Sequence, residues 1–218
     1  MKGKSENFES YSYAELDELI TRVLCDTASP ARVVDAAYCF GETLDNESSV
    51  LAAALLVWKL KRVNRIALCG EKAVAGYPGF ENWKAKIVKL GIGAKNIIGI
   101  PTDHDFPPST HAEAWGLARY ARKSKWKNIY VIAPPLHQFR AFVTTVTAFK
   151  REKVPARIYN FVGLPQRWEE HIIHSQGIQE GTRSELLGEE LKKIETYYKK
   201  GDLVSADEVL KYLDDRDT

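Results

Sequence analysis

The stretch Asn128-Ile-Tyr-Val-Ile-Ala-Pro-Pro-Leu-His-Gln-Phe-Arg140 decides the fold class of this chain. Residues 129–132 form an apolar run that predicts a strand buried on both faces, and the Pro-Pro pair then leads into an amphipathic helix. His137 and Arg140 lie three residues apart and therefore share one face of that helix. In an open α/β sheet, ligands bind beyond the carboxyl ends of the strands, where this helix begins. We therefore expect His137 and Arg140 to take part in binding or catalysis.

Further short apolar runs without alternation predict more buried strands, over residues 33–40, 65–69, 96–100 and 156–161. The segments between them have helical periodicity, over residues 49–61, 82–90 and 111–121. Strands that alternate with helices predict an α/β protein with a Rossmann-like, doubly wound, mostly parallel five-stranded sheet and helices on both faces. Gly91 and Gly93 are expected to end the second of these helices in a left-handed cap.

Helices are also predicted at both ends of the chain. Ser12-x-x-Glu15 is a capping box that starts a helix reaching about Cys25, so residues 1–30 are expected to pack on the core as an N-terminal helix. Residues 31–164 form the α/β domain, and residues 165–218 form a helical C-terminal extension. In that extension we predict helices and no strand, over residues 166–175, 184–200 and 205–214. The extension is expected to brace the sheet or to form a dimer contact.

Composition excludes some functions. The chain has 218 residues, 44% of them hydrophobic and 28% charged, with a formal net charge of +2. Such a balance predicts neither nucleic-acid nor membrane binding. Because residues 1–7 lack the apolar core of a signal peptide and no run approaches the length of a membrane helix, we predict a cytoplasmic protein.

The ends of the first four strands carry polar residues and glycines. Gly41-Glu42 follows the first strand and Gly70-Glu71 the second, while Thr110-His-Ala-Glu113 follows the third and His137 the fourth. These loops meet at one edge of a parallel sheet, which makes that edge the predicted site. Arg140 and the helix start would hold an anionic group, His137 would act as acid or base, and Glu42 or Glu113 would orient hydroxyls or amines.

Each of these residues also has a structural interpretation. Thr110-x-x-Glu113 is a capping box, in which both side chains would satisfy backbone N–H groups. His111 is expected either to face the crevice or to lie on the surface or in the core. His137 and Arg140 would in that case lie on a solvated helix start.

Cysteine chemistry and metal binding are not expected. Cys25, Cys39 and Cys69 lack CxxC spacing and lie in or beside apolar runs, so buried thiols are favoured over a nucleophile at Cys39 or Cys69. Residues 103–105 (Asp-His-Asp) and His171-x-x-His174 contain ligand types but match no metal site, and we interpret both as exposed. GxGxxG, GxxxxGK[ST], GxSxG and HExxH motifs do not occur.

The order of short motifs over residues 33–162 resembles the YdcF/SanA/ElyC-like bacterial family, a domain family of largely unknown function. The resemblance rests on Phe40-Gly41, Cys69-Gly-Glu71, Phe80-Glu-Asn-Trp83, residues 109–114 (Ser-Thr-His-Ala-Glu-Ala) and residues 135–141 (Pro-Leu-His-Gln-Phe-Arg-Ala). The chain departs from the family pattern after the threonine, where Ala112 and Glu113 replace an acid and an asparagine.

The resemblance implies a Rossmann-like sheet with a crevice and places Gly41, Gly70, Glu81, Thr110, His137 and Arg140 at recurrent family positions. Because the chain has no anchor, it resembles the soluble branch, some members of which bind S-adenosylmethionine. We therefore expect an enzyme, a transferase or hydrolase, that acts on a small anionic or nucleotide-like molecule, with S-adenosylmethionine as the implied ligand and no metal. A homodimer is compatible with this interpretation. The alternatives are a metabolite-binding module that signals through its C-terminal helices and a scaffold whose edge residues only cap helices.

Overall fold

The computed structural model describes residues 12–26, 28, 30, 33–174 and 179–218. Its main sheet has five parallel strands in the order β3-β2-β1-β4-β5, which confirms the predicted Rossmann-like fold. The strands are β1 (Ala36–Cys39), β2 (Ile66–Cys69), β3 (Ile97–Ile100), β4 (Asn128–Ile132) and β5 (Arg157–Asn160). Apart from the two middle residues of β3 and the first residues of β4 and β5, their residues are buried, as the unbroken apolar runs predict.

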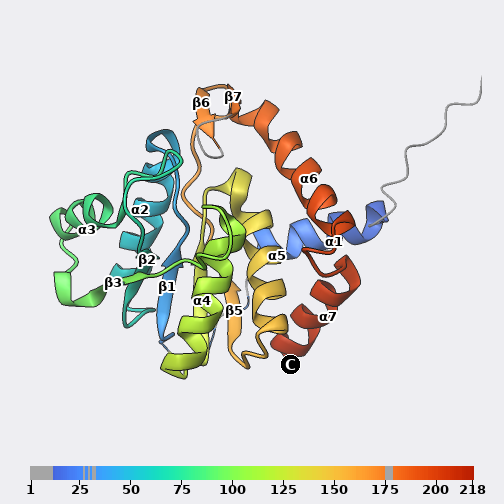
Figure 1. The fold of residues 1–218 in the computed structure, drawn as a ribbon, viewed down its shortest axis with the longest axis horizontal. Helices are drawn as coiled ribbons and strands as arrows, with labels where there is room; N and C mark the ends of the chain where they lie inside the picture. Colours follow the sequence, from blue (N-terminus) through green and yellow to red (C-terminus); the bar gives the residue numbers. More distant parts are fainter. Residues whose placement is uncertain (1–11, 27, 29, 31–32, 175–178) are drawn as a thin grey trace, which may run out of the picture.

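Helices cover both faces of the sheet (Figure 1). One face packs against α2 (Leu44–Lys59) and α3 (Phe80–Lys89), and the other packs against α4 (Thr110–Ser124) and α5 (Pro135–Arg151). A short 3-10 helix, η1 (Ala94–Asn96), leads into β3. Gly91, with φ +99°, follows α3 in the left-handed conformation, as expected.

Helices from both ends of the chain pack outside α5. They are α1 (Tyr13–Leu24), α6 (Arg183–Lys199) and α7 (Ala206–Asp217), and residues of all three share one buried cluster with the α4/α5 face. Capping boxes start each of them, at Ser12, Thr182 and Ser205. None of the helices in the described ranges is long and apolar enough to cross a membrane.

The prediction that no strand follows the α/β domain is wrong. Residues 171–174 form β6 (His171–His174), which pairs antiparallel with β7 (Gln179–Thr182), and residues 166–170 are irregular. Burial along β6 alternates, with Ile172 and His174 inward and His171 and Ile173 exposed, a period of two that a helix cannot satisfy. The hairpin of β6 and β7 lies at the top of Figure 1, where α6 begins.

Candidate functional site

The site lies where the order of the sheet reverses. β1 and β4 are neighbours in the sheet. The chain continues from β1 to β2 on one side of this pair, and from β4 to β5 on the other side. The crevice beyond the carboxyl ends of two such strands is where doubly wound proteins bind ligands. Glu42 follows β1 and His137 follows β4, so their side chains meet across this crevice.

A chain of three polar side chains crosses the crevice. His137 Nδ1 makes a short contact with Glu42 Oε1, and His137 Nε2 lies 3.1 Å from Thr110 Oγ1. Glu42 comes from the loop before α2, Thr110 is the first residue of α4, and His137 lies in the first turn of α5. All three residues are buried, with exposed fractions of 4%, 8% and 3% for Glu42, Thr110 and His137. The hydroxyl therefore has an imidazole beside it that a carboxylate orients.

Burial changes the acidity of both partners of the Glu42–His137 pair. Loss of solvent, reinforced by the charge of Glu190, raises the pKa of Glu42 well above its usual range. Loss of solvent and the nearby Arg140 guanidinium lower the pKa of His137 well below its usual range. Both changes favour the uncharged form of the group concerned.

Arg140 joins this chain to the C-terminal helix α6. Its Nη1 donates to Thr110 Oγ1 at 2.6 Å, while Nε and Nη2 donate to the two carboxylate oxygens of Glu190 at 2.6 and 3.3 Å. After accepting from Arg140, Thr110 Oγ1 keeps one lone pair and its own proton, and the tautomer of His137 sets which of the two faces Nε2. Despite burial, the Arg140 charge holds the pKa of Glu190 well below its usual range.

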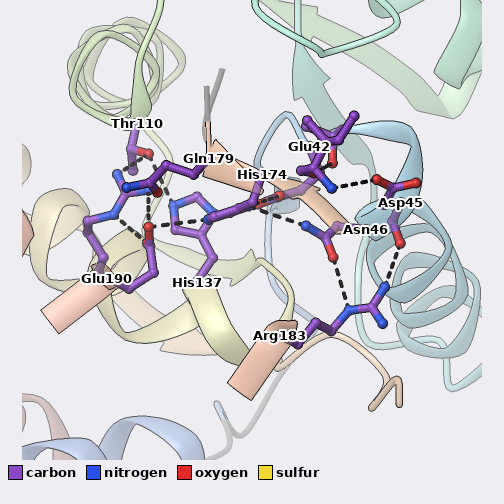
Figure 2. Close-up of polar contacts among 12 residues, drawn as sticks. Glu42, Asp45, Asn46, Thr110, His137, His174, Gln179, Arg183 and Glu190 are labelled. Carbon is purple, nitrogen blue, oxygen red and sulfur yellow. Dashed lines mark hydrogen bonds and ion pairs between the residues drawn. The ribbon is translucent and has the colours of Figure 1, made fainter. Parts of the chain in front are cut away.

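The hairpin contributes a second buried histidine to the same cluster. His174 lies with its Nε2 3.2 Å from Glu190 Oε1 and its Nδ1 3.3 Å from the Asn46 amide nitrogen. Figure 2 shows His137 and His174 side by side between Glu190 and Glu42. Lys193, one helical turn after Glu190, donates to Glu190 at 2.7 Å. Glu190 thus accepts hydrogen bonds from cations on two helices and contacts the imidazole of the hairpin.

Arg183 fixes the hairpin to α2. Its Nε donates to the Asn46 carbonyl oxygen at 3.2 Å, and its Nη2 donates to the Asp45 backbone carbonyl at 2.8 Å (Figure 2). In addition, the Thr43 hydroxyl donates to the Ile173 backbone carbonyl, and the Asp45 carboxylate accepts from the Ile173 backbone N–H. These contacts hold His174 over the carboxyl ends of the strands.

Glu113 is the second carboxyl group of the site. Its Oε2 accepts hydrogen bonds from the Tyr38 hydroxyl at 2.8 Å and from the Gly41 backbone N–H at 3.0 Å. Burial raises its pKa from 4.5 to about 7, although both hydrogen bonds oppose the change. A side chain at residue 41 would lie 3.3 Å from Glu113 Oε1 and from the Tyr77 ring, so glycine leaves room for both.

A small cavity of about 90 Å³ opens between these groups. It is lined by seven of the predicted site residues, namely Gly41, Glu42, Glu71, Thr110, Glu113, His137 and Arg140. Glu71 follows β2 and uses Oε1 to accept from the backbone N–H and hydroxyl of Thr102. The cavity therefore carries three carboxyl groups, one of which belongs to the hydrogen-bonded chain of Glu42, His137 and Thr110.

Three predicted ligand-binding residues lie elsewhere. Gly70 approaches β3 so closely that a Cβ there would lie 2.9 Å from the Ile100 backbone, which gives the glycine a packing role. Glu81 is exposed in the first turn of α3 and does not line the cavity. His111 lines a neighbouring cavity on the other side of Thr110.

The structure also decides the alternatives at α4 and at the acidic loop. Ser109, not Thr110, caps α4 by accepting a hydrogen bond from the Ala112 backbone N–H. The capping-box interpretation of Thr110 and Glu113 is therefore wrong. Both side chains are free to turn toward the sheet edge. Asp103 is buried and pairs with Arg119 at 3.0 Å. The exposed interpretation of the Asp-His-Asp loop therefore does not hold for Asp103. Within the described ranges, no cluster of three or more His, Cys, Asp or Glu side chains is arranged to hold a metal ion.

The prediction of buried thiols is confirmed for Cys39 and Cys69 and is wrong for Cys25, which is exposed after the end of α1. Cys39 and Cys69 are buried at the ends of β1 and β2, and burial raises the pKa of both thiols far above neutral pH. Neither thiol is therefore an activated nucleophile.

Sequence reasoning missed four members of the cluster: Asn46, His174, Glu190 and Lys193. The sequence predicts His174 as exposed on a helix, because the adjacent Ile172 and Ile173 hide the alternating burial of β6. Glu190 lies among charged residues of α6 and carries no signal of burial in the sequence.

Comparison with known proteins adds nothing to this geometry, since no family model, no curated protein and no solved structure matches the chain. Fold and site together define a Rossmann-like α/β protein with a carboxylate–histidine–hydroxyl chain at the reversal of its sheet order. The resemblance to YdcF-like proteins stays a prediction.

Proposed function

We propose that the protein is a hydrolase or acyl transferase in which the Thr110 hydroxyl is the nucleophile. The hydrogen-bonded chain Glu42–His137–Thr110 supports this proposal, because it has the connectivity of a carboxylate–histidine–hydroxyl triad. In the tautomer that carries its proton on Nδ1, His137 Nε2 takes the hydroxyl proton while Thr110 Oγ1 forms a bond to the carbonyl carbon of an ester or amide. His137 then gives the proton to the leaving oxygen or nitrogen as its bond to that carbon breaks, and water or an acceptor alcohol or amine releases the acyl group from Thr110.

Two neighbouring groups support the same role. The Arg140 guanidinium, 2.6 Å from Thr110 Oγ1, stabilises negative charge that develops on this oxygen. The backbone N–H of His111, the second residue of α4, has no helical carbonyl to bond and lies next to the nucleophile, where it can stabilise an oxyanion. Since Glu190 already neutralises Arg140 and carboxyl groups line the cavity, an uncharged or cationic acyl compound fits better than a phosphate.

Acylation by p-nitrophenyl esters tests the proposal. We expect intact-protein mass spectrometry to show an acyl adduct that peptide mapping places on Thr110. Thr110→Val, which removes only the hydroxyl, should abolish this adduct, and His137→Asn should slow its formation about 10²-fold or more. His171→Asn, which alters an exposed histidine of the hairpin, is the matched control and should react like wild type.

Thermal melts of each variant show whether it is folded. An adduct that forms equally in Thr110→Val, or a wild type that reacts with no ester at all, would exclude Thr110 as the nucleophile.

Glu71 favours a second candidate function, a binding module for a nucleoside-like ligand such as S-adenosylmethionine. In Rossmann folds an acidic residue that follows the first βα unit accepts hydrogen bonds from ribose hydroxyls, and Glu71 directly follows β2 and lines the cavity. Glu190 and His174 would couple such a site to the C-terminal segment.

Thermal-shift titration with S-adenosylmethionine and adenosine separates the two candidates. A ligand at ~100 times its dissociation constant adds about 2.7 kcal/mol to the free energy of unfolding. Under this second candidate, Glu71→Gln should lose the shift, the exposed Glu81→Gln should keep it, and ligand should slow hydrogen exchange in α6. Stabilisation that persists in Glu71→Gln would place the ligand elsewhere.

A further inference from the structure

A second cavity lies on the far side of Thr110 and Arg140 from the first. It encloses about 300 Å³, and the two cavities share Ser109, Thr110, Arg140 and Tyr197 as a common wall. Its volume reaches the lower end of the range for small-molecule sites. The proposed nucleophile therefore stands between two cavities rather than at the end of one.

The second cavity is lined by the rings of Phe106, His111 and Tyr197 and by polar side chains that include Thr144 and Asp202. His111 stacks on Trp115 with ring centroids 3.8 Å apart and planes 12° apart, and Phe106 lies 4.3 Å from the His111 ring. Tyr197 of α6 and the apolar side chain of Leu203 line the cavity as well. Phe106 is 40% exposed, so part of its ring is accessible to a ligand.

The His111 ring is suited to stacking. Burial lowers its pKa below the usual value, so the ring is uncharged at neutral pH. Its Nε2 is buried without a hydrogen-bond partner in the described part of the chain.

We infer that this second cavity binds a planar aromatic group of the substrate, with the ring packed against Phe106 and His111. The inference rests on the proposed function in one respect: the bond attacked by Thr110 would lie at the shared wall, between the aromatic group and the part of the substrate in the first cavity. Ring stacking there would select aromatic acyl compounds over aliphatic ones of equal length.

Indole is a suitable probe because it is planar, uncharged and too small to need the first cavity. We expect indole to bind the intact protein in calorimetry and to show nuclear Overhauser contacts with the Leu203 methyl groups. Phe106→Leu, which keeps an apolar side chain but removes the ring, should weaken binding about 3- to 10-fold. Trp168→Leu is the matched control, because Trp168 is 41% exposed against 40% for Phe106 and lies outside both cavities. This variant should bind indole like wild type.

His137→Asn separates this inference from the proposed function. Indole binding should be unchanged in His137→Asn even though acylation is slowed, because His137 lines the first cavity and not the second. Undetectable indole binding to wild type, or equal affinity of Phe106→Leu and wild type, would overturn the aromatic subsite whatever the outcome of the acylation experiment.

Discussion

At the scale of single residues, Glu113 controls how the site responds to pH. Its pKa of about 7 in the folded protein exceeds the 4.5 of an unperturbed glutamate, because the buried carboxyl group resists ionisation. Between these two values the unfolded chain releases a proton that the folded protein keeps. Glu113 therefore lowers the free energy of unfolding as pH rises from about 5 to 8.

Glu113→Gln should remove this loss, since glutamine retains an oxygen that can accept from Tyr38 and Gly41. The two pKa values of Glu113, 4.5 and about 7, set the size of the effect at 1.36 kcal/mol per pKa unit. Between pH 5 and pH 8, the free energy of unfolding of the variant should therefore rise relative to that of wild type by on the order of 3 kcal/mol. Urea unfolding of both proteins at the two pH values measures it. Parallel stability profiles would show that Glu113 titrates like an exposed carboxylate.

At the scale of elements, the position of α4 depends on one glycine. A Cβ at Gly116 would lie 2.1 Å from the Pro101 carbonyl oxygen, so α4 lies in direct backbone contact with the segment after β3. This close approach sets where the first turn of α4 presents Thr110 and Glu113. Gly188 of α6, by contrast, has no atom within 4 Å of its added Cβ.

Gly116→Ala should therefore destabilise the protein by about 1–3 kcal/mol or more and slow acylation, because α4 must move away from the sheet. Gly188→Ala, the matched control in another helix, should stabilise it by roughly 0.5–1 kcal/mol. Chemical denaturation compares the two. Equal effects of both substitutions would contradict the contact between α4 and residue 101.

The helices and strands also show how much of the fold sequence patterns can predict. The five strands and their helices are predictable because each strand is buried on both faces and so forms an unbroken apolar run. Residues 171–174 and 179–182 escape prediction because the His-Ile-Ile-His of β6 does not alternate in sequence and the Gln-Glu-Gly-Thr of β7 has no apolar content. The role of Glu190 is hidden because its burial depends on Arg140, which lies fifty positions away along the chain.

At the scale of the whole molecule, a buried ion pair joins the two ends of the described chain. Arg216 of α7 and Asp26 after α1 pair through two hydrogen bonds of 2.7 and 2.9 Å, and both side chains are 2% exposed. Arg216 also donates to the Ile158 carbonyl of β5 at 3.0 Å. The pair therefore fastens the outer helices to the last strand of the sheet.

Arg216→Met should cost about 3–5 kcal/mol, because it leaves the Asp26 carboxylate buried without its cation. Arg22→Met, which breaks a pair with the exposed Asp214, should cost less than about 1 kcal/mol. Thermal unfolding measures both. A loss for Arg216→Met no larger than for Arg22→Met would show that the buried pair does not fasten the ends together.

The contacts of Glu190 have a consequence for how such a protein can diverge. One carboxylate satisfies Arg140 on α5, contacts His174 on the hairpin and accepts from Lys193 on its own helix. A recombination that joined the C-terminal segment of one homologue to the sheet of another would have to bring compatible partners at each of these places at once. The segment and the sheet are therefore expected to be inherited as one unit, and new specificities to arise by substitution around the cavities rather than by exchange of the tail.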